Sequence, residues 1–62
     1  MTLQKGDKVV ISNNSVFKMM GFDVVHGEVF LIYPAHPGFA FKCKETGHME
    51  TADLDDGQIE KL

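Results

Sequence analysis

The strongest β-strand signal in the chain lies in residues 23–33, DVVHGEVFLIY. Val24 and Val25 lead into the segment, and β-branched and aromatic residues, which suit a pleated and half-buried surface, fill almost all of residues 29–33. Gly27 interrupts the run, and an isolated glycine inside a strand indicates a bulge or a sharp bend. We therefore expect one long strand that turns a corner at Gly27.

Four shorter strands are expected around this long one. Turn signals rich in proline, glycine or acidic residues occur at residues 34–38, 45–47 and 53–57. Between and beside them, strands are predicted within residues 5–12, 39–44, 48–52 and 58–62. Five short strands favour a barrel over a helical bundle, and closure of a barrel removes exposed sheet edges.

Alternation along the strands predicts the interior, because side chains two residues apart lie on the same face of a strand. In residues 39–44 this places apolar side chains on one face and two lysines, with Ala40, on the other. The same rule predicts one interior shared by Val9, Ile11, Val29, Leu31, Phe39 and Phe41. Cys43 falls on the face of the two phenylalanines and is expected to be a small core residue.

A loop with one helical turn is expected over residues 15–22. Ser15 is the expected N-cap, and Gly21 is the expected end of the turn. Three apolar residues of this loop are expected to cover the core: Val16, Met19 and Phe22. Phe17 and Met20 are then left as an exposed apolar patch, and we take both as candidate protein-binding residues, because loops often carry binding residues.

A second candidate surface is the turn that follows the long strand. Tyr33 and His36 lie there, beside prolines that prevent further strand pairing. An aromatic ring and an imidazole at such a turn suit the docking of a peptide or the stacking of a base. Tyr33 and His36 are therefore further candidate protein-binding residues.

Length and composition restrict the class of protein. A chain of 62 residues forms a single domain, residues 1–62, because a second core would have nothing to bury. The one cysteine excludes an intramolecular disulfide and favours a reducing compartment. No apolar run approaches the roughly 18 residues that span a bilayer, and the N-terminal residues do not resemble a signal peptide. We expect a cytoplasmic protein that does not bind membranes.

Three short elements in residues 5–32 form a recognisable pattern: Gly6-Asp7-Lys8-Val9-Val10-Ile11, then Phe17-Lys18, then Gly27-Glu28-Val29. This pattern resembles the KOW motif at the start of an SH3-like barrel. The resemblance implies an all-β fold, a small five-stranded SH3-like barrel with a short helical turn in the first long loop. It also implies binding to nucleic acid or ribosomes, for which the basic residues here are Lys5, Lys8, Lys18, Lys42 and Lys44.

The charge balance disfavours nucleic acid as the partner. The net charge is −3, and all six basic residues other than histidine are lysines. Arginine is the usual bidentate ligand of phosphates and guanine edges, and the chain contains none. An acidic, arginine-free domain is a poor electrostatic match for a polyanion.

Metal and catalytic motifs are incomplete. Cys43 and His48 bracket one turn, but a structural zinc site needs four ligands, usually in pairs. In the acidic run that starts at Asp53, Gly57 falls at the fifth position, where a calcium-binding EF-hand loop needs an oxygen ligand. No serine or cysteine has a histidine and a carboxylate fixed beside it by a motif. We expect no metal, no cofactor and no catalytic residues.

These observations favour a non-enzymatic protein-binding module, a small accessory or modulator protein that docks on a larger complex. Two alternatives stay open. One is a nucleic-acid- or ribosome-associated domain of the KOW type, whose affinity would fall steeply with salt. The other is a homo-oligomeric structural domain, in which the apolar loop is the interface between copies.

Overall fold

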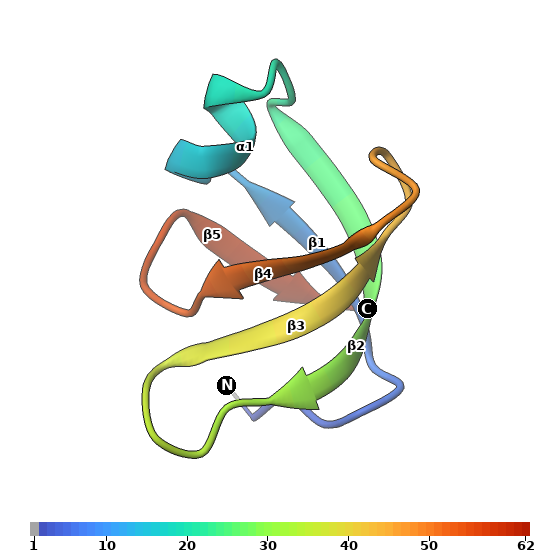
Figure 1. Ribbon diagram of the computed structural model, residues 1–62, viewed down its shortest axis with the longest axis vertical. Helices are drawn as coiled ribbons and strands as arrows, with labels where there is room; N and C mark the ends of the chain where they lie inside the picture. Colours follow the sequence, from blue (N-terminus) through green and yellow to red (C-terminus); the bar gives the residue numbers. More distant parts are fainter. Residues whose placement is uncertain (1) are drawn as a thin grey trace.

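The computed structural model describes residues 2–62 (Figure 1). Along the chain the elements are β1 (Lys8–Ser12), α1 (Ser15–Met19), β2 (Val24–Ile32), β3 (Gly38–Cys43), β4 (Met49–Asp53) and β5 (Gln58–Lys61). The predicted all-β class, the five strands and the helical turn in the first long loop are confirmed. Within residues 2–62 no helix has the length and apolar character needed to span a membrane.

The strands form one antiparallel sheet in the order β4-β3-β2-β1-β5. Strands β1 to β4 pair in sequence order, and β5 returns to pair with β1. Figure 1 shows the nine-residue strand β2 curving between β3 and β4 in front and β1 and β5 behind. Because β4 and β5 are the two edges of the sheet and do not pair, the sheet curls like a barrel without closing.

The core lies inside this curl, as alternation predicted. Five of the six predicted interior residues are at most 1% exposed: Val9, Ile11, Val29, Phe39 and Phe41. Cys43 is also buried as a free thiol, which confirms its predicted place in the core. Val25 and Ala52 complete the cluster from β2 and β4, so all strands but the edge strand β5 contribute a buried side chain.

Leu31 is the exception, and its predicted place in the interior is wrong. Its side chain is 50% exposed. The register explains this, because Val29 pairs with Phe41 and Leu31 with Ala40, so that Phe30 and Leu31 together oppose one residue of β3. This β-bulge shifts the alternation by one residue, and Ile32 packs against the core in place of Leu31.

Gly27 does not mark the bulge, which was one of the two roles predicted for it, the other being a sharp bend. It pairs regularly with Cys43, and the irregularity comes later in the strand. A Cβ atom at this position would collide with the ring of Phe41 and with the carbonyl oxygen of Lys42. Glycine is therefore required at position 27 because β3 approaches β2 closely there.

The helical turn α1 is capped by Asn14, so the predicted N-cap at Ser15 is one residue too late. The Oδ1 atom of Asn14 accepts hydrogen bonds from the amides of Val16, at 3.0 Å, and Phe17, at 3.1 Å. The acidic turn after β4 supports the same end of α1, because Asp56 accepts bonds from the amide and hydroxyl of Ser15, at 3.0 and 2.6 Å. These contacts fix a helix too short to be stable alone.

Candidate functional site

Phe17 anchors α1 in the core. Its side chain is 2% exposed, and its ring meets Phe41 edge to face with the centroids 5.7 Å apart. The prediction that Phe17 forms an exposed binding patch is therefore wrong. The buried side of the turn is displaced by one residue from the predicted one, and one residue corresponds to a rotation of about 100° around a helix.

The opposite face of α1 is apolar and points to solvent. Met20 is 47% exposed, which confirms its predicted exposure, and Met19 is 89% exposed. Val16 is 54% exposed, so the prediction that Val16 and Met19 cover the core is wrong, whereas Phe22 does pack against it. Residues three and four apart on a helix are neighbours, so these three side chains form one surface. We call it the α1 tip (Val16, Met19 and Met20).

Backbone hydrogen bonds hold the turn beneath the α1 tip. The amide of Met20 donates to the carbonyl oxygens of Val16 and Phe17, at 3.2 and 3.1 Å. Gly21 ends the helix with a φ of +97°, as the sequence predicted, and the amide of Phe22 donates to the Phe17 carbonyl oxygen at 2.9 Å. The α1 tip is therefore a preformed surface whose exposed side chains rest on a fixed turn.

Tyr33 and His36 come together as predicted, but far from α1. Their ring centroids are 5.2 Å apart, with Tyr33 half-buried and His36 exposed. Figure 1 places the β2–β3 loop, which carries both, and α1 at opposite ends of the long axis of the molecule. The four predicted protein-binding residues therefore do not form one surface.

Four of the five lysines predicted for nucleic-acid binding gather around the outward side of β2. In the register of the sheet, Lys8 and Lys42 lie on either side of Glu28. Lys5 places its Nζ atom 5.1 Å from the centroid of the Phe30 ring. The amide of Lys44 donates to the carbonyl oxygen of His26. Lys18 lies elsewhere, on α1, and donates to the Asn13 side chain.

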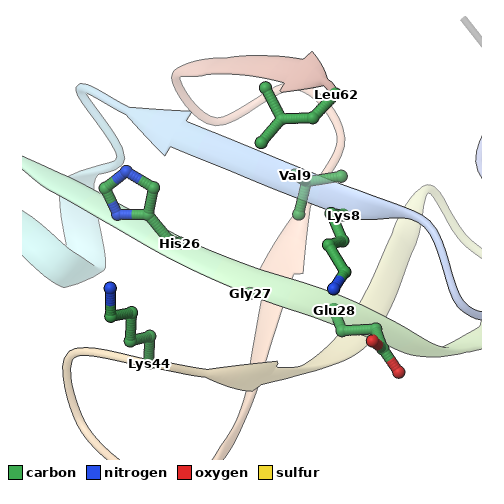
Figure 2. Close-up of a pocket in the computed structure, with 7 residues that line it drawn as sticks. All are labelled: Lys8, Val9, His26, Gly27, Glu28, Lys44 and Leu62. Atoms are coloured by element: carbon green, nitrogen blue, oxygen red, sulfur yellow. The ribbon is translucent and has the colours of Figure 1, made fainter.

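A shallow groove with a volume of about 340 Å³ lies over this part of the sheet (Figure 2). Four charged or titratable side chains line it, with Val9 and Leu62 at one side: Lys8, His26, Glu28 and Lys44. Figure 2 shows His26 and Lys44 on one side of Gly27 and Lys8 and Glu28 on the other. Sequence reasoning missed His26, although its outward position on β2 follows from the alternation with Val25.

His26 is held by Glu45, from the β3–β4 turn. Its backbone amide donates to Oε1 of Glu45 at 2.6 Å, and its Nδ1 atom lies 2.6 Å from Oε2. Partial burial raises the pKa of the Glu45 carboxyl group, but the hydrogen bonds from His26 outweigh it, so the pKa lies below its ordinary value of 4.5. The pair ties the β3–β4 turn to β2 at one end of the groove.

The chemistry of the described residues is limited. Among residues 2–62, no three histidine, cysteine or acidic side chains lie together in a way that would hold a metal ion. The Cys43 thiol, the strongest candidate nucleophile, is buried and lies 3.9 Å from Glu45. The candidate functional surfaces are therefore the α1 tip and the outward side of β2.

No protein-family model, no curated protein and no solved structure matches the chain.

Proposed function

We propose that the protein is a non-enzymatic protein-binding module, an accessory domain that docks on a larger complex through the α1 tip. The observation that carries this proposal is the exposure of Met19, which is 89% exposed on a turn held by backbone hydrogen bonds. Leaving such a side chain in water is unfavourable, and burying one methionine on a partner contributes about 1.5–3 kcal/mol. The fixed turn adds to this, because a preformed surface loses little conformational entropy on binding.

The charges around the α1 tip indicate what the partner surface looks like. Asp56 is bonded to the first residue of α1, and Asp55 precedes it in the same turn. Asp23 follows the loop on the other side, where its carbonyl oxygen accepts from the amide of Asn13. Lys18 is the basic residue on α1 itself. We therefore propose an apolar pocket with a basic rim as the partner surface.

The order of the strands supports an SH3-like interpretation of the fold. Five antiparallel strands form a β1–β4 meander whose last strand, β5, returns to β1, and this curled sheet is compatible with the five-stranded barrel that the KOW resemblance implies. The glycine–aspartate pair of the pattern forms the turn into β1, where the Gly6 amide donates to the Val29 carbonyl oxygen at 2.8 Å. A buried free thiol at Cys43 fits the reducing cytoplasm that we propose as its compartment.

The test compares two methionines on different elements. Tagged wild type, Met19→Asp and Met49→Asp are used for affinity capture from a nuclease-treated extract of the native cell. Met49 is the matched control, because it is 50% exposed on β4 and outside α1. We expect the same captured protein with wild type and Met49→Asp and its loss with Met19→Asp. Thermal unfolding of all three should agree closely, because exposed positions contribute within about 0.5 kcal/mol.

Capture that survives Met19→Asp would contradict the proposal. Capture that disappears on nuclease treatment would favour the nucleic-acid alternative instead. Sedimentation over a concentration series separates the third possibility: if wild type self-associates and Met19→Asp is monomeric, then the α1 tip is an interface between copies and the accessory role is wrong.

A further inference from the structure

We propose that the outward side of β2 is a second binding surface, which takes an acidic peptide segment with interspersed apolar residues. This surface is defined by His26, Glu28, Phe30 and Leu31 and is distinct from the α1 tip. It carries an exposed apolar pair, a groove and a set of lysines. The apolar pair and the groove follow one another along β2, and the lysines lie around them.

The apolar pair is exposed by the β-bulge. Phe30 and Leu31 together oppose Ala40, so both side chains lie on the outward side of the sheet, and they are 51% and 50% exposed. A regular strand would send one of two successive side chains inward. Ala40 is small and only 6% exposed, so it forms a low floor beneath the larger pair. The bulge thus presents two large apolar groups where alternation would present one.

Lysines surround this pair. Lys5 lies over the Phe30 ring, and Lys8 and Lys42 lie on the strands on either side of β2. Lys44 reaches the groove at the other end (Figure 2). Within residues 2–62, none of these four lysines forms an ion pair with an acidic side chain, whereas Lys61 pairs with Asp7 at 3.4 Å. Their ammonium groups are therefore available to a negatively charged ligand.

The spacing fits a short extended segment. From His26 to Leu31 the strand rises by roughly 17 Å, which is the length of five or six residues of an extended peptide. Apolar side chains of such a segment would pack on Phe30 and Leu31, and its carboxylates would face Lys8, Lys42 and Lys44. The groove of about 340 Å³ would receive one end of the segment.

A peptide fits this surface better than a nucleic acid strand. Glu28 lies between Lys8 and Lys42, so an unbroken row of phosphates would meet a carboxylate at its centre. Glu45 adds a second negative charge beside His26. A peptide avoids these conflicts because its charged and apolar side chains are separated.

The experiment uses NMR titration of the full ¹⁵N-labelled chain at low salt with four probes. These are a six-residue peptide of alternating aspartate and leucine, its aspartate–serine and lysine–leucine counterparts, and an oligothymidylate. We expect the aspartate–leucine peptide to shift amides of β2 and its neighbours and to leave α1 unshifted. Leu31→Ser and Lys42→Glu should each weaken its binding about tenfold or more. Lys18→Glu and Met19→Asp are the matched controls and should leave binding unchanged.

Three results would overturn the proposal: no binding of the aspartate–leucine peptide, equal binding of the aspartate–serine or lysine–leucine peptide, or preferential binding of the oligothymidylate. The last result would make the lysines a nucleic-acid surface. Because Met19→Asp removes the α1 tip and not this surface, the proposal and the accessory function fail independently.

Discussion

A shift of one residue decides which side of α1 is available for binding. Asn14, not Ser15, caps the turn, and Phe17, not Val16 or Met19, enters the core. Both asparagine and serine are good N-caps, so the sequence did not distinguish between two neighbouring candidates. An additional contact favours Asn14: its side-chain Nδ2 atom donates a hydrogen bond to the Asp56 carbonyl oxygen at 3.1 Å, across 42 residues of sequence. Local patterns contain no sign of it.

Substitutions of Phe17 and Met19, which lie two residues apart on α1, should differ sharply in their effect on stability. We expect Phe17→Ala to lower the free energy of unfolding by about 3–5 kcal/mol, because it removes a buried ring from the core. Met19→Ala should change it by no more than about 0.5 kcal/mol, because the side chain is exposed. Urea unfolding followed by circular dichroism measures both. Similar losses for the two variants would show that the assigned faces of α1 are wrong.

At the scale of whole elements, the bulge in β2 decides which side chains of the strand are exposed. The strand itself was predicted from its β-branched and aromatic residues, but the bulge was not. Residues 29–32 are all apolar, so no change of polarity marks the point where the alternation shifts. A bulge at Gly27 was one of the two roles predicted for this glycine, but the close approach of β3 is what requires glycine there. The exposure of Leu31 therefore follows only from the pairing of β2 with β3.

Two carboxylates join separate elements, and acid should weaken both connections. Glu45 ties the β3–β4 turn to β2, and Asp56 ties the β4–β5 turn to α1. The hydroxyl and amide of Ser15 lower the pKa of Asp56 below its ordinary value of 3.8, and the pKa of Glu45 is lowered below 4.5. As the pH falls, the unfolded chain therefore binds protons at these two carboxylates before the folded chain does. Their stabilising effect is complete above about pH 4.5 and is lost as the pH falls through the folded-state pKa values.

Urea midpoints measured from about pH 6 down to pH 3 test this linkage. Glu45→Gln and Asp56→Asn should each be less stable than wild type at the upper end of the range. Each variant should also lose less stability on acidification, so that its curve approaches that of wild type. Curves that stay parallel over the whole range would show that neither carboxylate contributes to the acid sensitivity.

At the scale of the whole molecule, the net charge of −3 conceals a separation of charge. Lys5, Lys8, Lys42 and Lys44 surround the outward side of β2, whereas Asp55 and Asp56 lie beside α1. Composition gives an acidic average, but four of the six lysines gather on one side of the sheet. The lysines are far apart in sequence and meet only through the strand register.

Most of the fold was predictable because it depends on patterns that repeat. Five strands, the turns between them and five of six interior residues follow from period-two alternation and from glycine and proline. The errors at Phe17 and Leu31 are both displacements of one residue, one in the phase of a helix and one in the phase of a strand. Each arises where a long-range contact decides between two local choices. The binding surfaces depend on those phases, and so they were predicted less well than the fold.

The proposed function depends on α1 holding Phe17 in the core and leaving Met19 exposed to a partner. Paramagnetic relaxation of the free protein by a soluble gadolinium chelate measures this exposure directly. We predict that the methyl group of Met19 relaxes faster than those of Met20 and Met49, and that the ring protons of Phe17 are protected. A protected Met19 methyl group, or a Phe17 ring that relaxes as fast as Met19, would contradict the account.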